Sequence, residues 1–129
     1  MTEPALVGVN VLFLEDDAVI NLDMGDALET MGCNVVSCLT MRQAWDAIEG
    51  DSPDVAILDV NVHHTTSLDL ADSLDTRGIP ILFLTGYDVP ALTGKWRNRP
   101  VCRKPCDFTR LKQLLVDILA EKRRPDGEA

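Results

Sequence analysis

The chain has 129 residues, of which 46% are hydrophobic, and its 12 basic and 21 acidic residues give a net charge of −9. This length is typical of one domain, so we expect a single domain over residues 1–129, with a core from about residue 8 to residue 122 and flexible ends. The acidic balance disfavours binding to nucleic acid or to an anionic membrane, because both require a basic face. No segment reaches the ~20 apolar residues of a membrane-spanning helix. Because the first residues also lack a signal-peptide pattern, we expect a cytoplasmic protein.

The first half of the chain alternates short apolar runs with helical patterns. Residues 9–14 predict a strand, and Asp17 then opens a helix that ends near Gly32. Residues 34–38 predict a second strand, and residues 41–49 predict a second helix with its apolar side chains on one face. A strand followed by a helix is therefore the repeating unit of this half.

The second half continues the same alternation. It predicts a strand over residues 55–58, a helix over 67–76, a strand over 81–84, a weaker helix over 90–96 and a strand over 101–103. The final helix has the clearest pattern, because Leu111, Leu115 and Leu119 recur at helical spacing after Asp107, a predicted N-cap. Five strand–helix units joined by right-handed crossovers predict an α/β fold with a parallel sheet covered on both faces.

The four cysteines are Cys33, Cys38, Cys102 and Cys106. None belongs to a Cys-x-x-Cys pair, and disulfides are rare in the cytosol, so we expect reduced and mostly buried thiols. Zinc binding through the last two cysteines with His63 and His64 is an alternative that lacks a recognised ligand spacing.

Polar residues follow four of the five predicted strands at the point where each strand ends. Glu15 and Asp16 follow the first strand, Asp59 the third, Thr85 the fourth and Lys104 the last. Because the carboxyl ends of parallel strands lie along one edge of the sheet, these side chains should meet there.

These residue types suit phosphoryl transfer. The adjacent acids Glu15 and Asp16 repel each other unless a cation lies between them, and carboxylates favour Mg²⁺ or Mn²⁺. Asp59 beside that cation can accept a phosphoryl group as an acyl phosphate. The hydroxyl of Thr85 and the ammonium of Lys104 can stabilise charge on the transferred group. Each residue alone is also explained by an ordinary turn or helix start, so the prediction depends on their combination.

This combination resembles the receiver domain of two-component response regulators, over essentially the whole chain. The run Phe-Leu-Thr-Gly-Tyr at residues 83–87 is similar to a segment of small stand-alone receivers. The resemblance implies a flavodoxin-like (βα)5 fold with strand order 2-1-3-4-5. It also implies that Asp59 is phosphorylated and that Thr85 and Lys104, followed by Pro105, complete the site. The implied Mg²⁺ ligands are Glu15, Asp16, Asp59 and the main-chain carbonyl of Asn61.

Some positions differ from the usual receiver pattern. Val101 stands where many members have a Tyr or Phe that turns inward on activation, and Cys106 replaces the Phe that usually follows Lys-Pro. His63 and His64 replace a common Pro-Gly. Because Val101 lacks a ring, we expect Tyr87 to be the switch candidate.

The expected function is phosphorylation-dependent signalling without a DNA-binding output domain. The chain would accept a phosphoryl group from a histidine kinase or a histidine phosphotransfer protein and regulate a downstream protein partner, without itself being a conventional enzyme. A phosphate shuttle in a phosphorelay is an alternative. A flavodoxin-like cofactor-binding domain is another, although no Gly-rich phosphate loop follows the first strand. A degenerate receiver is disfavoured because every site residue is retained.

Overall fold

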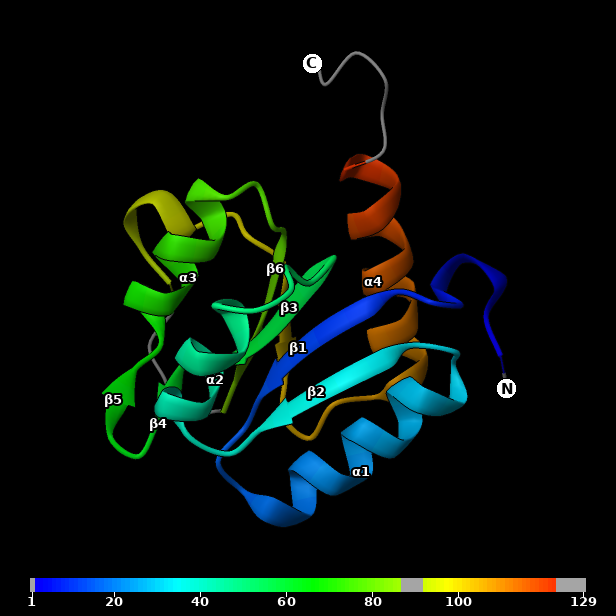
Figure 1. Ribbon diagram of the computed structural model, residues 1–129, viewed down its shortest axis with the longest axis horizontal. Coiled ribbons are helices and arrows are strands. Elements are labelled where there is room, and N and C mark those ends of the chain that lie inside the picture. The colour runs from blue at the N-terminus through cyan, green and yellow to red at the C-terminus, as the bar shows by residue number, and fades with distance from the viewer. Residues whose placement is uncertain (1, 87–91, 123–129) are drawn as a thin grey trace.

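The computed structural model describes residues 2–86 and 92–122 and contains a five-stranded parallel sheet (Figure 1). Its strands, in spatial order, are β2 (Asn34–Cys38), β1 (Asn10–Leu14), β3 (Val55–Asp59), β6 (Ile81–Thr85) and β7 (Val101–Arg103). All four neighbouring pairs are parallel. When the strands of this sheet are numbered in chain order, the arrangement is 2-1-3-4-5, which confirms the expected flavodoxin-like order.

Helices cover both faces of the sheet (Figure 1). Helices α1 (Ala18–Thr30) and α4 (Phe108–Lys122) share one apolar core with one face, and α2 (Met41–Ile48) and α3 (Leu68–Thr76) share a second core with the other. The helical apolar patterns of the sequence face these two cores, because each helix must bury its apolar stripe against the sheet. No helix within the described ranges is long and apolar enough to cross a membrane.

Local sequence signals explain where the helices begin and end. The side chain of Asp17 accepts hydrogen bonds from the backbone N–H groups of Val19 and Ile20, so it caps α1 as expected. Asp107 accepts in the same way from Thr109 at the start of α4. Gly32, in the turn after α1, has φ of 110°, and a Cβ there would lie 3.0 Å from the backbone of Val7. The position therefore requires glycine.

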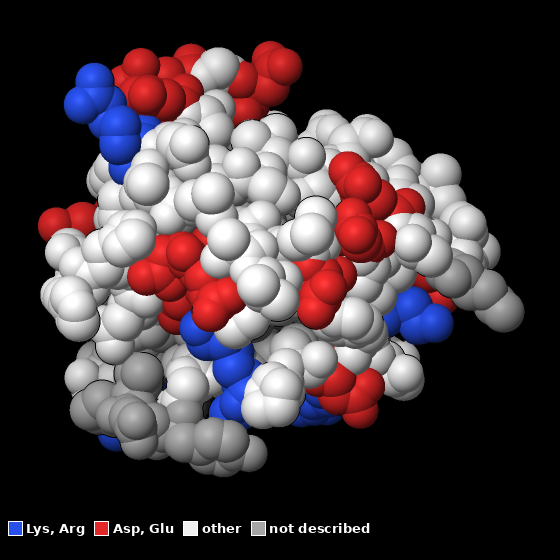
Figure 2. All heavy atoms as spheres, turned by 90° about the horizontal axis from the view of Figure 1, so that it is seen from below, with Lys and Arg blue, Asp and Glu red and all other residues white. Residues whose placement is uncertain are grey.

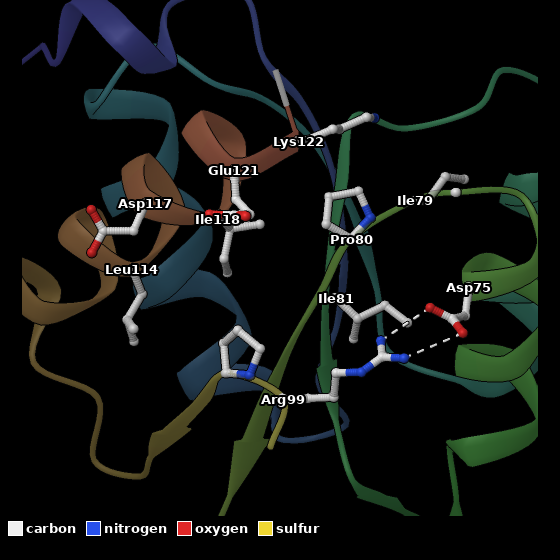
Figure 3. A pocket seen from close by; sticks show the side chains of 12 residues that line it. Asp75, Ile79, Pro80, Ile81, Arg99, Leu114, Asp117, Ile118, Glu121 and Lys122 are labelled. Carbon is white, nitrogen blue, oxygen red and sulfur yellow. Dashed lines mark hydrogen bonds and ion pairs between the residues drawn. The ribbon is translucent and has the colours of Figure 1, made fainter. Parts of the chain in front are cut away.

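The weak helix expected over residues 90–96 is not formed in the part that is described. Residues 87–91 lie outside the described residues, and the remainder contains only a 3-10 turn, η2 (Gly94–Trp96). Gly94 has φ of 63°, which interrupts a right-handed helix. Trp96 is buried instead, with its ring edge-on to Phe83 at a centroid distance of 5.5 Å. The guanidinium of Arg99 lies over the Trp96 ring and forms an ion pair of 3.0 Å with Asp75 of α3 (Figure 3). Tertiary packing of this ring therefore outweighs the weak helical pattern.

A short hairpin follows the third strand of the sheet and was absent from the sequence prediction. Strand β4 (Asn61–Val62) pairs antiparallel with β5 (Thr65–Thr66). The turn residues His63 and His64 have φ of 50° and 65°, a conformation that two-residue hairpin turns need and that Asn and Gly usually supply. Histidines at these positions give no turn signal, so the hairpin was missed.

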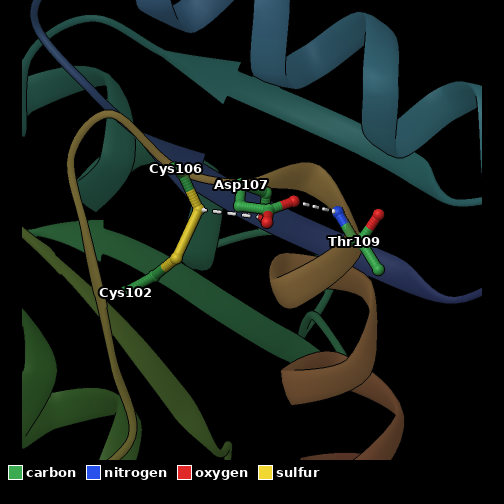
Figure 4. The surroundings of a disulfide bond; sticks show 4 residues. All are labelled: Cys102, Cys106, Asp107 and Thr109. Carbon is green, nitrogen blue, oxygen red and sulfur yellow. Dashed lines mark hydrogen bonds between the residues drawn. A yellow bond between two sulfur atoms is a disulfide. The ribbon is translucent and has the colours of Figure 1, made fainter.

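The expectation of four reduced cysteines was wrong for one pair. Cys102 and Cys106 form a disulfide across the connection between β7 and α4, with their Cα atoms 6.1 Å apart (Figure 4). This pairing also uses the two sulfurs that the alternative zinc site required. Cys33 and Cys38 are free and buried as expected, and burial raises the pKa of each thiol to about 11. The chain reversal between β7 and α4, rather than any sequence motif, brings the bonded pair together.

Candidate functional site

Three charged side chains meet where the sheet strands end. Glu15 follows β1, Asp59 is the last residue of β3, and Lys104 follows β7. The Nζ of Lys104 lies 2.9 Å from Oε1 of Glu15 and 3.0 Å from Oδ2 of Asp59. The side chains of Glu15 and Asp59 are 0% and 4% exposed, and that of Lys104 is 21% exposed. One partly exposed ammonium therefore bridges two buried carboxylates.

Asp16 lies beside this bridge and nearer to solvent, with 25% of its side chain exposed. One carboxylate oxygen from each of Glu15, Asp16 and Asp59 lies within 4.8 Å of the others. Oδ2 of Asp16 accepts a hydrogen bond of 2.9 Å from the backbone N–H of His63, and Nδ1 of His63 is 3.7 Å from the same oxygen. Three carboxylates and one ammonium leave an excess of negative charge at this edge.

Thr85 reaches the same edge from the neighbouring strand. It is the last residue of β6 and is 6% exposed. Its carbonyl accepts a hydrogen bond of 2.8 Å from the backbone N–H of Lys104. Asp59 pairs with Leu84 in the register between β3 and β6, so Thr85 stands one residue beyond Asp59 on the adjacent strand.

Asn61 and Tyr87 complete the set of predicted residues. Asn61 begins β4 and lines an open polar pocket together with Asp16, His63 and His64. The fold thus brings Glu15, Asp16, Asp59, Asn61, Thr85 and Lys104 to one edge of the sheet. The switch candidate Tyr87 lies outside the described residues. On the face seen in Figure 2, acidic side chains gather in several groups with basic side chains beside some of them.

Two buried polar residues hold the backbone around the cluster, and the sequence reasoning missed both roles. The hydroxyl of Ser67 donates a hydrogen bond of 2.6 Å to the carbonyl of Asp59. The amide of Asn21 donates to the carbonyls of Glu15 and Cys38, at 3.0 and 3.1 Å. These bonds satisfy buried carbonyls next to the site. They join residues on different elements, so no local pattern indicates them.

Burial determines the electrostatics of the cluster. It raises the pKa of Glu15 from an ordinary 4.5 to about 7, although a hydrogen bond from the Asp17 backbone N–H and the ion pair with Lys104 oppose the change. Burial also raises the pKa of Asp59, again against Lys104. For Asp16 burial acts in the same direction, but hydrogen bonding, with the His63 N–H making the largest contribution, brings its pKa below the ordinary value. Burial acts to lower the pKa of Lys104, yet its two carboxylate partners raise it.

The raised pKa of Glu15 predicts how the stability of the metal-free protein depends on pH. A carboxyl whose pKa is higher in the folded state contributes stability that is complete below its unfolded value and is lost as the pH rises through its folded value. With values of 4.5 and about 7, Glu15 should therefore remove up to about 3 kcal/mol from the free energy of unfolding between about pH 4.5 and pH 8. Denaturant unfolding in a chelator, at several pH values, measures this slope.

The matched variant for this measurement is Glu15→Gln, which cannot ionise. Its stability should decline less than that of the wild type over the same pH range, and Mg²⁺ should reduce the wild-type decline. If the free energy of unfolding depends on pH equally in both proteins, ionisation of Glu15 is not the cause of the wild-type decline.

The donor set fits a hard divalent cation. Carboxylate oxygens are the ligands that Mg²⁺ and Mn²⁺ prefer, and three of them converge here. Burial raises the pKa of Glu15 more than Lys104 lowers it, so the ammonium only partly offsets the cost of burying this carboxylate. The acidic cluster is therefore compatible with Mg²⁺.

The fold and the cluster agree with comparisons to known proteins. Residues 11–115 match the response regulator receiver domain family. The chain therefore belongs to the receiver domains of response regulators, the proteins that act in two-component systems.

Particular relatives show how far the likeness extends. An uncharacterized response regulatory protein of Yersinia pestis is 30% identical over 114 residues, which cover 85% of this chain and 48% of that protein. The structure of the PhyR stress response regulator has a TM-score of 0.79 and 25% identity, over 93% of this chain and 48% of that one. The solution structure of SdrG from Sphingomonas melonis Fr1 has a TM-score of 0.74 and 31% identity, over 89% of this chain and 98% of that one. The chain thus spans about half the length of the first two relatives and nearly all of the SdrG chain.

Proposed function

We propose that this protein is a phosphorylation-dependent signalling protein that accepts a phosphoryl group on Asp59 and then regulates a protein partner. The donor is a histidine kinase or a histidine phosphotransfer protein, as is general for receiver domains. The observation that carries the proposal is the position of the Lys104 ammonium, 2.9 Å from Glu15 and 3.0 Å from Asp59, in a three-carboxylate cluster at the sheet edge. A receiver that had lost its function would not need this costly arrangement of buried charges.

Each residue has a chemical role in this proposal. A carboxylate oxygen of Asp59 attacks the phosphorus of the phosphohistidine, so that an O–P bond forms, the P–N bond breaks and the electron pair returns to the imidazole. The ammonium of Lys104 and the hydroxyl of Thr85 stabilise negative charge on the transferred group. Glu15, Asp16, Asp59 and the carbonyl of Asn61 would hold Mg²⁺, which supplies further charge stabilisation when bound.

A surface suited to the donor lies next to the site. On α1, Val19 and Leu22 are 70% and 64% exposed, and Phe108 at the start of α4 is 39% exposed. A pocket of about 480 Å³ between these elements is lined by Ile20, Phe108 and Lys104, among other residues. Exposed apolar side chains beside a reactive group favour docking of a partner that itself presents apolar residues. This surface would place a phosphohistidine near Asp59.

The test is phosphorylation by a small donor, acetyl phosphate, over a series of Mg²⁺ concentrations. We expect the intact mass to increase by one phosphoryl group, and a chelator to prevent the increase. Asp16→Ala should need at least ~10-fold more Mg²⁺ for the same rate, since even changes behind the metal ligands cost that much affinity. Phosphorylation that is equally fast in a chelator, or an Asp16→Ala variant with unchanged Mg²⁺ dependence, would overturn the proposed metal site.

A further inference from the structure

The disulfide between Cys102 and Cys106 closes a small ring of backbone that contains Lys104. The ring runs from Cys102 in β7 through Arg103, Lys104 and Pro105 to Cys106, just before α4 (Figure 4). Lys104 lies at the middle of this ring. Its backbone N–H donates to the carbonyl of Thr85, and its ammonium contacts Glu15 and Asp59. The cross-link therefore restricts the backbone that carries the bridging ammonium.

The two ends of the cross-link have different surroundings. Cys102 is 4% exposed and belongs to the apolar core that α1 and α4 share with the sheet. Cys106 is only partly buried, and it lines the pocket of about 480 Å³ that Lys104 and Phe108 also line. A reagent can therefore reach the sulfur of Cys106 from this pocket. Cys102 lies in the core within bonding distance of that sulfur.

The other two cysteines provide a contrast within the same chain. Cys33 and Cys38 are buried, at 5% and 2% exposure, and each lies in a different apolar core. Burial also keeps both thiols protonated, since it raises the pKa of each to about 11. Redox chemistry in this protein should therefore be confined to the pair that flanks Lys104.

We propose that Cys102 and Cys106 are a reversible redox modification site that controls how readily Asp59 is phosphorylated. The inference rests on the proposed function of Asp59. The oxidant is a peroxide. The Cys106 thiolate attacks one peroxide oxygen, which breaks the O–O bond and gives a sulfenic acid and, with a proton, water. The Cys102 thiol then attacks that sulfur, so the S–S bond forms and a second water leaves. A dithiol reverses the change by two thiol–disulfide exchanges and is itself oxidised to a disulfide.

The redox state of Cys102 and Cys106 should change how freely the backbone of Lys104 moves. In the disulfide form the ring holds the Lys104 backbone beside Thr85, so that the ammonium stays directed at Glu15 and Asp59. In the dithiol form the connection to α4 can move, and the ammonium spends less time at the phosphorylation site. Because a positioned ammonium stabilises the transferred phosphoryl group, we expect the disulfide form to be phosphorylated severalfold faster.

The experiment compares wild-type protein treated with hydrogen peroxide and with dithiothreitol, each reagent being removed before assay. Alkylation and mass spectrometry identify the bonded pair, and acetyl phosphate with Mg²⁺ gives the phosphorylation rate. Hydrogen exchange of the Lys104 amide is the readout that does not need phosphorylation, and it should be faster in the dithiol form. Cys106→Ser should match the dithiol form under both treatments, and Cys33→Ser, at the free cysteine just before β2, should respond as the wild type does.

The outcomes separate this inference from the proposed function. Equal phosphorylation rates and equal Lys104 amide exchange in the two forms would overturn the redox inference and leave phosphorylation of Asp59 intact. Recovery of Cys106 as a free thiol after peroxide would overturn it as well. Absence of phosphorylation in both forms, with a difference in amide exchange, would instead overturn the proposed function while supporting redox control of the Lys104 backbone.

Discussion

Replacing Asp59 with asparagine is expected to abolish phosphorylation by acetyl phosphate. Asparagine has the same shape and its Oδ1 can still accept a hydrogen bond from Lys104, which lies 3.0 Å from the native Oδ2. Its amide, however, has no carboxylate oxygen with which to form an acyl phosphate. Intact-mass spectrometry should show one added phosphoryl group on the wild type and none on Asp59→Asn.

Two controls keep this result interpretable. Burial is the largest cause of the high pKa of Glu15, and repulsion from Asp59 adds to it. Burial also raises the pKa of Asp59 itself, so Asp59→Asn should melt at or above the wild-type temperature without metal. If the variant is folded but is not phosphorylated, the cause is loss of the accepting carboxylate and not loss of the fold. Asp69→Asn, at an exposed aspartate in the first turn of α3, should be phosphorylated as the wild type is. Phosphorylation of Asp59→Asn at the wild-type rate would assign the acceptor to another residue.

Replacing Lys104 with methionine is expected to destabilise the metal-free protein strongly at neutral pH and to suppress phosphorylation. Methionine keeps much of the stem but leaves Glu15 and Asp59, at 0% and 4% exposure, without their shared cation. Removing one partner of a buried ion pair typically costs ~3–5 kcal/mol. For a domain of this size that corresponds to a melting temperature lower by about 10 °C or more.

The pH dependence of this loss shows whether charge is its cause. Burial already raises the pKa of both carboxyls, and loss of the ammonium removes an interaction that opposes the rise, so the difference from the wild type should shrink as the pH falls. Mg²⁺ at neutral pH should recover part of the stability. Lys112→Met, in α4, is the matched control and should change little. A loss that is the same at pH 5 and pH 7 would mean that Lys104 stabilises the fold through its stem.

Much of this protein is determined by its sequence alone, because it depends on local periodicity and on strand ends. The spacing of Leu111, Leu115 and Leu119 predicts a helix that the structure contains, and all three side chains are buried. The apolar runs predict five parallel strands. Glu15, Asp59 and Lys104 follow three of these strands, so the sequence predicts that they meet at one edge of the sheet. These inferences hold because a strand or helix pattern indicates which face is buried, and parallel strands align their ends.

The tertiary structure decided the features that depend on contacts between distant or irregular segments. Glu15 and Lys104 are 89 positions apart, and only the folded sheet places the ammonium between two particular carboxylates and buries both. In the described part of a segment predicted to be helical, residues 92–96, a 3-10 turn places Trp96 against Phe83. The reversal after β7 joined Cys102 to Cys106, against the expectation of free thiols. Local sequence patterns predict which side chains are buried. The contacts that a side chain makes, the geometry of its bonds and its pKa depend on the environment that the whole fold creates.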